Sequence, residues 1–302
     1  MRTSRHLAGA SAISVAAVLW GLDGVVLTPR LFNLDVIFVV FILHALPFFL
    51  MSSFLFRQYH KLSLFTRADL VYFLLVAVTG GILGTLLIVK ALFLVGFNRL
   101  SAIVLIQKLQ PVFAVILAAI VLKECITGRF ILWAVIALIG SYFLTFGFHI
   151  PDFSAGDDIA LAAVYSFLAA ASFGASTVFS KKMLTRWPFE TVTFYRYGFT
   201  AFIMFFIVLV SGQLSEFSMA TTQNWIIILI IGITTGSGAI FLYYWGLNRV
   251  KAIVATFCEL FFPVSAVLFD YLVNRNTLSL VQWLAAIVLI FAVIRISRLR
   301  RE

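Results

Sequence analysis

Long apolar stretches alternate with short polar connectors along the whole chain. A helix needs about 20 mainly apolar residues to cross the hydrocarbon core of a bilayer, and only helices and closed barrels satisfy their backbone polar groups there. The stretches lack the two-residue alternation of a barrel strand. The pattern therefore predicts an all-α integral membrane protein with ten transmembrane helices, at 8–28, 36–56, 70–95, 100–122, 130–148, 159–180, 192–211, 225–246, 252–273 and 280–297.

The composition agrees with a lipid environment. Hydrophobic residues make up 63% of the chain and charged residues 11%, whereas soluble domains carry about 45–50% and about 25%. The formal net charge of +10 does not indicate nucleic acid, because the basic residues lie between the apolar stretches. Cys125 and Cys258 show no metal-ligand spacing. We expect the lipid bilayer and a small-molecule substrate as partners, no nucleic acid, no metal and no cofactor; a homodimer is left open.

The distribution of basic residues predicts the orientation. Cytoplasmic loops carry an excess of Lys and Arg. If both termini are cytoplasmic, 16 of the 22 Lys and Arg lie on the cytoplasmic side and three lie outside, namely Arg30, Arg99 and Arg275. The remaining three fall inside spans. We therefore predict cytoplasmic termini, in a bacterial cytoplasmic (inner) membrane.

The chain repeats itself at an offset of 150 to 153 residues. The stretch GFNRLSAIV at 96–104 recurs as GLNRVKAIV at 246–254. The other corresponding landmarks are Trp20-Gly21 with Phe173-Gly174, Gly80 and Gly84 with Gly232 and Gly236, and Pro111 with Pro263. With five spans in each half, the second half is upside down, which predicts two inverted five-helix repeats at 1–150 and 151–302. Inverted repeats are typical of secondary transporters, which hold substrate near the midplane, and paired glycines permit close helix packing.

Two five-span repeats, Trp20-Gly21 in the first span and Lys123-Glu124 after the proline-containing fourth span resemble the EamA family of the drug/metabolite transporter superfamily. The resemblance covers 8–297. It implies a ten-helix carrier of small metabolites, often amino acids or nucleotide-like solutes, that frequently works as an exporter. Family members usually carry Gly-Glu after the proline helix in both halves. The second half here reads Asn274-Arg275-Asn276, so the outer end of the ninth helix departs from the family pattern.

Polar residues gather around the two mid-span prolines. A proline leaves the carbonyl four residues earlier without its helical hydrogen bond; these are the carbonyls of Gln107, before Pro111, and of Glu259, before Pro263. Since Gln107 and Glu259 are equivalent in the repeat, we predict that two kinked helices meet here and form the substrate site, with Lys108 beside the first. The alternative is that Lys108 and Glu259 only neutralise each other.

Further polar residues are candidates for substrate contact. Gln110 lies three positions from Gln107 and shares its helix face. Trp20 and Asp23 lie in the first span and Lys90 in the third. An ionisable group inside a span costs about 2.5–3.5 kcal/mol, so each needs a reason. Asp23 binds a substrate ammonium group or a proton in one interpretation and pairs with Lys90 in the other; Lys90 itself can reach outward to the membrane surface.

Glu259, Asp23 and His44 are the candidates for proton coupling. His44 titrates near neutral pH, although hydrogen-bonded structural histidines are the commoner case. We expect Arg196, near the cytoplasmic end of the seventh span, to reach the lipid headgroups. The default interpretation of Tyr243-Tyr244-Trp245 is an interfacial aromatic belt.

The predicted function class depends on the motifs that the chain lacks and on its internal repeat. It contains no GxxxxGK[ST] motif and no HExxH motif, and no carboxylate lies one turn from His44, so ATP hydrolysis and enzyme activity are not supported. The sequence predicts a secondary transporter of small metabolites, amino-acid-like or other zwitterionic or charged solutes, that works by alternating access and favours export. Proton coupling, exchange and passive transport stay open. The alternative is a flippase for lipids or lipid-linked solutes.

Overall fold

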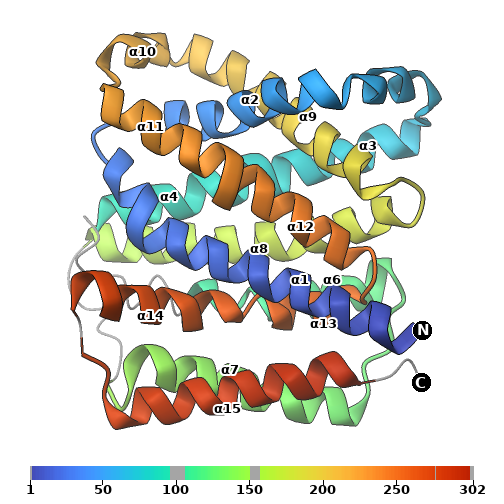
Figure 1. The fold of residues 1–302 in the computed structure, drawn as a ribbon, viewed down its shortest axis with the longest axis vertical. Coiled ribbons are helices and arrows are strands. Elements are labelled where there is room, and N and C mark those ends of the chain that lie inside the picture. The colour runs from blue at the N-terminus through green and yellow to red at the C-terminus, as the bar shows by residue number, and fades with distance from the viewer. Residues whose placement is uncertain (1, 96–105, 150–156, 276, 300–302) are drawn as a thin grey trace.

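The computed structural model describes residues 2–95, 106–149, 157–275 and 277–299. Within these ranges the chain forms helices joined by short connectors, without strands (Figure 1). The first half comprises α1 (Arg2–Leu22), η1 (Asp23–Leu27), η2 (Thr28–Leu31), α2 (Val36–Phe54), η3 (Phe56–Leu64), α3 (Arg67–Val76), η4 (Ala77–Leu83), α4 (Gly84–Leu94), α6 (Gln110–Val121) and α7 (Gly128–Phe146). The second half comprises α8 (Asp157–Leu184), α9 (Phe189–Val210), η5 (Gln213–Ser215), α10 (Glu216–Met219), α11 (Thr222–Ile231), η6 (Gly232–Gly236), α12 (Ser237–Leu247), α13 (Ala252–Cys258), α14 (Phe261–Asn274) and α15 (Leu280–Arg298). The predicted all-α fold is confirmed.

Nine helical segments of the described chain are long and apolar enough to cross a membrane. Several consist of consecutive helices in one line, such as α3, η4 and α4 over Arg67–Leu94. The predicted fourth span at 100–122 is described only from residue 106, and its apolar helix Gln110–Val121 is shorter than the others. Residues 100–105 lie outside the described residues, so the tenth span stays a prediction over that part.

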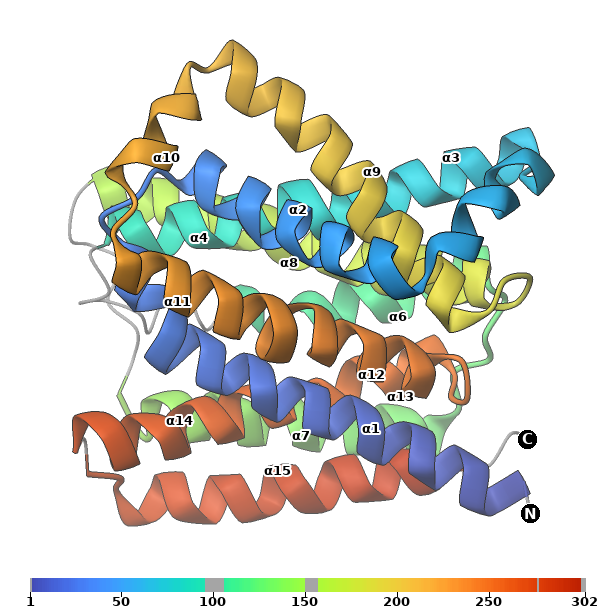
Figure 2. The same cartoon turned by 45° about the horizontal axis from the view of Figure 1, so that its top comes forward.

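Helices of the first half pack against helices of the second half (Figures 1 and 2). The first span, α1, lies against α12 and α14, and α8, the first span of the second half, lies against α4 and α6. Because α12 and α14 correspond to α4 and α6 in the repeat, each half makes the same pair of contacts with the other half. The second spans α2 and α9 pack together, and so do the last spans α7 and α15. The arrangement fits two repeats related by a twofold axis.

Local structure repeats as well. Thr66 and Asp69 form a capping box at the start of α3, and Thr221 and Asn224 form one at the start of α11. Each of these helices then passes through a π-helical segment, η4 or η6. Such segments insert an extra residue per turn and are frequent at functional sites. The predicted glycine pairs lie at these segments.

The two glycine pairs have different surroundings. A Cβ on Gly80 would lie 2.1 Å from Ser176 Oγ, and one on Gly84 would lie 2.7 Å from the ring of Phe173, so both glycines allow α8 to approach closely. A Cβ on Gly232 would make only ordinary contacts at 3.5 Å or more. One on Gly236 would meet a carbonyl of its own helical segment at 2.8 Å. Close packing between helices is thus a property of the first pair.

The ends of the two proline helices match in backbone conformation. Lys123, after α6, has φ of 53°, and Arg275, after α14, has φ of 61°. Both are non-glycine residues in the left-handed region, which is uncommon. The equivalent turn therefore persists at the ninth helix although its residue types depart from the family pattern.

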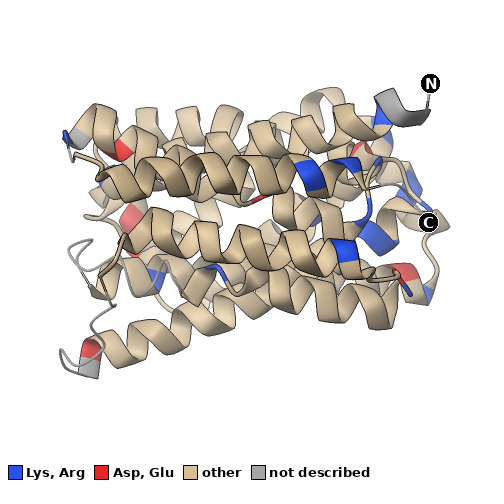
Figure 3. Cartoon of the chain, turned by 90° about the horizontal axis from the view of Figure 1, so that it is seen from below, with Lys and Arg blue, Asp and Glu red and all other residues tan. Residues whose placement is uncertain are grey.

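The charged residues lie mainly at the two ends of the bundle. Figure 3 shows most of the Lys and Arg at the end where both termini lie, beside long uncharged helices. One ion pair at that end joins Arg186 of the α8–α9 connector to Asp69 of α3, with 2.8 Å between the charged atoms. The middle of the bundle carries few charges, and the orientation of the two ends in the membrane stays a prediction.

Candidate functional site

Both proline-containing spans are broken. The helical run of the fourth span is interrupted at residues 108–109, and Pro111 is the second residue of the new helix α6. The ninth span is interrupted at Glu259 and Leu260, and Pro263 lies in the first turn of α14. A proline fits the first turn of a helix, because the N–H groups there have no intrahelical partner. The expected kinks are therefore breaks.

One detail of the predicted site is wrong. The Glu259 carbonyl is not left open by Pro263, since it accepts a hydrogen bond from the backbone N–H of Phe262 at 2.9 Å. The tight turn at the break replaces the bond that the proline removes. The chemistry at this position consequently belongs to the Glu259 side chain.

The Glu259 carboxylate is the centre of a hydrogen-bond cluster. Tyr243 of α12 donates its hydroxyl to Oε1 at 2.6 Å, and Thr177 of α8 donates to the same oxygen at 3.5 Å. Gln110 of α6 donates its side-chain amide to Oε2. Residues 252–258 and Leu260 are buried, whereas Glu259 between them is partly exposed. The carboxylate therefore accepts hydrogen bonds from donors on three different helices.

The bond between Gln110 and Glu259 joins the two breaks. The first lies at the start of α6 and the second between α13 and α14, in opposite halves of the chain. Gln107, one turn before Gln110, has a buried side-chain oxygen Oε1 without a hydrogen-bond partner among the described residues. A buried acceptor without a donor is costly. The structure thus brings the predicted Gln110 and Glu259 together and leaves a buried, unpartnered acceptor at Gln107.

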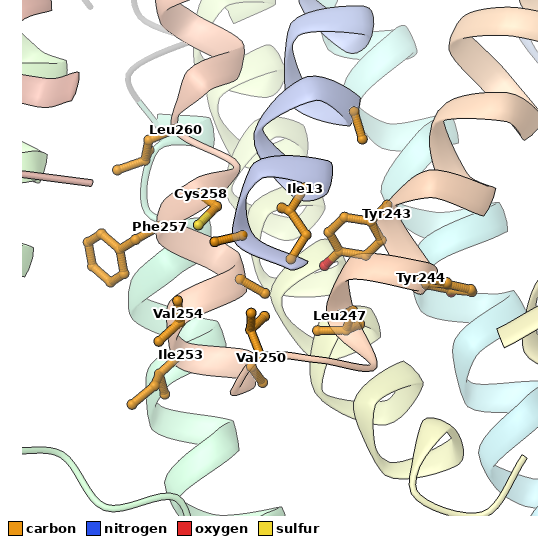
Figure 4. Close-up of a cluster of buried hydrophobic side chains, with 14 of the residues drawn as sticks. Ile13, Tyr243, Tyr244, Leu247, Val250, Ile253, Val254, Phe257, Cys258 and Leu260 are labelled. Atoms are coloured by element: carbon orange, nitrogen blue, oxygen red, sulfur yellow. The ribbon is translucent and has the colours of Figure 1, made fainter. Parts of the chain in front are cut away.

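Aromatic rings form one wall beside this cluster. The rings of Trp20 and Tyr243 lie 5.3 Å apart between centroids, and Trp20 is partly exposed. Figure 4 shows Tyr243 pointing toward α1 beside Ile13, with Tyr244 on the opposite side of α12. Tyr243 and Tyr244 are 3% and 0% exposed, so the expectation that they form an interfacial belt is wrong.

Lys108 lies in a different environment from Glu259. Its ammonium group donates to the backbone carbonyl of Ser141 at 2.8 Å and to the hydroxyl of Thr145, both on α7. Lys108 is 8% exposed. The alternative of a Lys108–Glu259 ion pair is not formed, because the lysine reaches α7 while the carboxylate is bonded to Gln110, Tyr243 and Thr177.

The other predicted polar residues form no hydrogen bond with the Glu259 cluster among the described residues. Asp23 is partly exposed and accepts a bond from Thr28 at 3.0 Å, and Lys90 is exposed; the two form no ion pair in the described chain. His44 is buried, and its Nδ1 lies 2.8 Å from the carbonyl of Val40 on its own helix. The structure gives His44 the hydrogen-bonded structural contact that was weighed against a proton relay.

Arg196 does not reach the lipid headgroups, contrary to expectation. It is 7% exposed; its guanidinium donates to the hydroxyl of Tyr244 at 2.9 Å and to the carbonyl of Gly80 in η4 at 3.1 Å. Tyr244 also exchanges a hydrogen bond with Ser180 at 2.7 Å. The guanidinium therefore holds the π segment of the first half against α9 and α12 of the second.

The sequence did not reveal the role of Glu124. Its two carboxylate oxygens accept the backbone N–H groups of Ala252 and Ile253 at 2.8 and 3.0 Å. These are first-turn donors of α13 without intrahelical partners, and the preceding residue Lys251 supplies no side-chain cap. A residue of the first half thus caps the short helix that ends at Glu259.

The cluster has defined chemical properties. It contains a carboxylate that accepts N–H or O–H donors, a buried amide oxygen at Gln107 and the partly exposed ring of Trp20. Within the described residues no group of three or more His, Cys, Asp or Glu side chains is placed to hold a metal ion. Lys108 bonds to α7 and does not face the carboxylate, so the cluster does not present the paired opposite charges expected for a zwitterion.

Known proteins resemble this chain along nearly all of its length. The model of the EamA-like transporter family matches residues 7–146 and 160–298. The riboflavin transporter ImpX of Fusobacterium nucleatum is 51% identical over 295 residues, which cover 97% of this chain and 99% of that protein. An uncharacterized transporter of Synechocystis is 27% identical over 243 residues, covering 78% and 68%. A crystal structure with 16% identity superposes with a TM-score of 0.71 over 98% of this chain and 96% of the other, a likeness of fold alone.

Proposed function

The chain belongs to the EamA-like transporter family, and from this premise we propose that it carries riboflavin across the membrane by alternating access. The family and the apolar helices make it an integral membrane transporter of small metabolites. The relative of 51% identity, which is named for riboflavin transport, supports the choice of substrate. We place the protein in a bacterial inner membrane with both termini on the cytoplasmic side. Most of the Lys and Arg lie at the end of the bundle that holds the termini, which supports this orientation (Figure 3).

The observation that carries the proposal is the Glu259 carboxylate at the junction of the two halves, with the partly exposed ring of Trp20 beside its partner Tyr243. The flavin ring system is planar and aromatic, and its pyrimidine edge carries an N–H group between two carbonyls. The carboxylate of Glu259 or the unpartnered oxygen of Gln107 accepts this N–H, while the partly exposed ring of Trp20 contacts the ring face. Aromatic pairs of this kind contribute about 0.5–1.5 kcal/mol beyond the area they bury.

Transport occurs by rocking one repeat against the other around this site. The helix breaks at residues 108–109 and 259–260 lie where the halves meet, and the Gln110–Glu259 bond crosses between them. A substrate that takes over the Glu259 oxygens weakens this crossing bond. Binding would thereby loosen the contact between the two halves that holds the present conformation.

Uptake by purified protein in liposomes tests the proposal. Radiolabelled riboflavin is expected to enter protein-containing vesicles in a saturable manner, with competition from excess unlabelled riboflavin and none from excess lysine or glutamate. Entry no faster than in protein-free vesicles contradicts riboflavin as the substrate. Competition by amino acids restores the amino-acid-like class predicted from the sequence. Lipid scrambling in the same vesicles is the test of the flippase alternative.

We assign the coupling proton, if the flux is coupled, to Glu259. It is the predicted coupling residue that lies in the cluster, whereas Asp23 is bonded to Thr28 and His44 to its own helix. Groups that act on Glu259 are Tyr243, Gln110, Thr177 and, through its charge, Arg196. Initial rates of riboflavin transport that are equal with and without a pH gradient contradict proton coupling and leave passive transport or exchange. The direction of net flux is measured by comparing uptake of external riboflavin with release of riboflavin loaded inside the vesicles.

A further inference from the structure

A cavity lies at the end of the bundle where the termini are, apart from the Glu259 cluster. It has a volume of about 580 Å³ and is lined by Arg5, Ala8, Trp245, Asn248 and Arg249. Small-molecule sites typically occupy about 300–1,000 Å³. Three of its features, the repeated motif, the two guanidinium groups and the indole of Trp245, define what it can bind.

The repeated motif builds this cavity. Gly246 and Gly9 form a close crossing of α12 and α1: a Cβ on Gly246 would lie 2.5 Å from the Gly9 carbonyl oxygen, and one on Gly9 would lie 2.9 Å from that of Gly246. The cavity residues Asn248 and Arg249 follow directly in the motif GLNRVKAIV. The glycine thus fixes the crossing while the asparagine and arginine line the cavity beside it. The matching stretch at 96–104 lies outside the described residues.

The guanidinium of Arg249 is held in a fixed position. It lies over the ring of Trp245 at 3.6 Å from the centroid and donates to the Trp245 carbonyl at 2.6 Å. Stacking on an aromatic face leaves the outer edge of a guanidinium free to donate further hydrogen bonds. Arg249 is therefore ordered before any ligand arrives, which reduces the entropy lost on binding.

Two positive charges line the cavity without a paired anion. In the described part of the chain neither Arg5 nor Arg249 lies within ion-pair distance of a carboxylate. Burial, together with the neighbouring charge of Arg5, lowers the pKa of Arg249, against the opposing effect of Glu190. Arg5 also lies in the first turns of α1, where the helix dipole is positive. The two charged residues that line this space are both cations, and Glu190, which acts on Arg249 through its charge, is not part of the lining.

We propose that this cavity binds a phosphate group carried by an ester, held by Arg5 and Arg249, with the organic part of the ester against Trp245. A guanidinium matches two phosphate oxygens with parallel N–H donors. The side-chain amide of Asn248 supplies a further donor. The site is separate from the Glu259 cluster and stands whichever solute is carried. The ester is either the headgroup of an anionic phospholipid or a soluble phosphate ester on the same side of the membrane.

Binding measurements on the full-length protein in detergent distinguish these sources. Native mass spectrometry with dioctanoyl phosphatidylglycerol, and with dioctanoylglycerol as the phosphate-free control, probes the lipid headgroup. Calorimetric titration with glycerol 3-phosphate, and with glycerol as its control, probes the soluble ester. The variants are Arg5→Gln and Arg249→Gln, with Arg57→Gln as the matched loss of one charge outside the cavity. Arg249→Lys keeps the charge and loses the two-pronged donor.

The expected result is binding of one phosphate-bearing probe that weakens at least about tenfold in Arg5→Gln and in Arg249→Gln, the scale of a lost charge-assisted hydrogen bond. Arg57→Gln should bind as the unmodified protein does, and Arg249→Lys should fall between. Loss of phosphatidylglycerol binding assigns the lipid source, and loss of glycerol 3-phosphate binding assigns the soluble one. Failure of both probes to bind the unmodified protein, or equal binding in all variants, overturns the proposal. Arg5→Gln alters an exposed side chain, so it reports binding even if Arg249→Gln folds poorly.

Discussion

Replacement of Glu124 by alanine should destabilise the protein through the helix that precedes the site. Glu124 accepts two first-turn N–H groups of α13, at 2.8 and 3.0 Å. Loss of a helix cap costs about 0.5–2 kcal/mol, and a hydrogen bond to a charged group contributes about 1.5–3 kcal/mol. Because the two bonds share one carboxylate, we expect a loss of about 2–3 kcal/mol. At about 2–4 °C per kcal/mol this lowers the Tm by roughly 5–10 °C.

Two further variants make the assay specific. Glu124→Gln keeps one acceptor and loses the charge, so its Tm should fall by about half as much. Asp158→Ala removes an exposed carboxylate from the first turn of α8, where only the helix dipole is affected, at about 0.3–1 kcal/mol. The Tm is followed by intrinsic fluorescence of purified protein in one detergent at one scan rate. If Glu124→Ala melts together with Asp158→Ala, the carboxylate does not hold α13 and the reasoning is wrong.

Three more variants test other contacts. Tyr243→Phe removes the hydroxyl that donates to Glu259 at 2.6 Å, so the riboflavin KM for transport should rise about tenfold or more; an unchanged KM counts against the cluster. Lys108→Met removes donors to the Ser141 carbonyl on α7 and should lower the Tm by several degrees, about 1–2 kcal/mol, with the KM unaltered; the reverse outcome would return Lys108 to the substrate site. Gly246→Ala places a methyl group 2.5 Å from a carbonyl oxygen of α1 and should cost about 1–3 kcal/mol, visible as a smaller monodisperse fraction in gel filtration; a normal yield and Tm would refute the close crossing.

The spans and repeats could be predicted because they depend on periodic properties of the sequence. Apolar length sets the crossing helices, and the two prolines mark equivalent breaks whatever surrounds them. The equivalence of Gln107 and Glu259 came from the same offset, and the structure places Glu259 beside Gln110, one turn from Gln107. In a membrane protein with two repeats, the sequence therefore predicts how far along a helix axis a residue lies.

The direction in which a side chain points could not be predicted from the sequence. Tyr243 and Tyr244 lie near the end of their span, where tyrosines usually face the interface, but α12 turns both into the bundle. Arg196 was expected near headgroups for the same reason and instead bonds to Tyr244. Lys108 is adjacent to the break yet points to α7. Which helix packs on which face decides these cases, and one sequence does not specify that.

Contacts between the two repeats could not be predicted from the sequence either. Glu124 caps a helix that begins 128 residues later in the chain, and no local pattern connects the two. The motif Lys123-Glu124 drew attention only through its resemblance to a family. A physical account of that glutamate requires the inverted packing that brings the end of the fourth span to the start of the ninth.

The central claim is that Glu259 forms part of the riboflavin site, and riboflavin affinity of Glu259→Gln tests it most directly. Titration of free riboflavin with purified protein, followed by quenching of flavin fluorescence on contact with aromatic rings, gives the Kd. We expect at least about tenfold weaker binding in Glu259→Gln, since a charged acceptor is lost. Lys90→Gln, an exposed position near the end of the third span, is the control that binds normally. An identical Kd in Glu259→Gln and the unmodified protein, at equal Tm, would contradict the central claim.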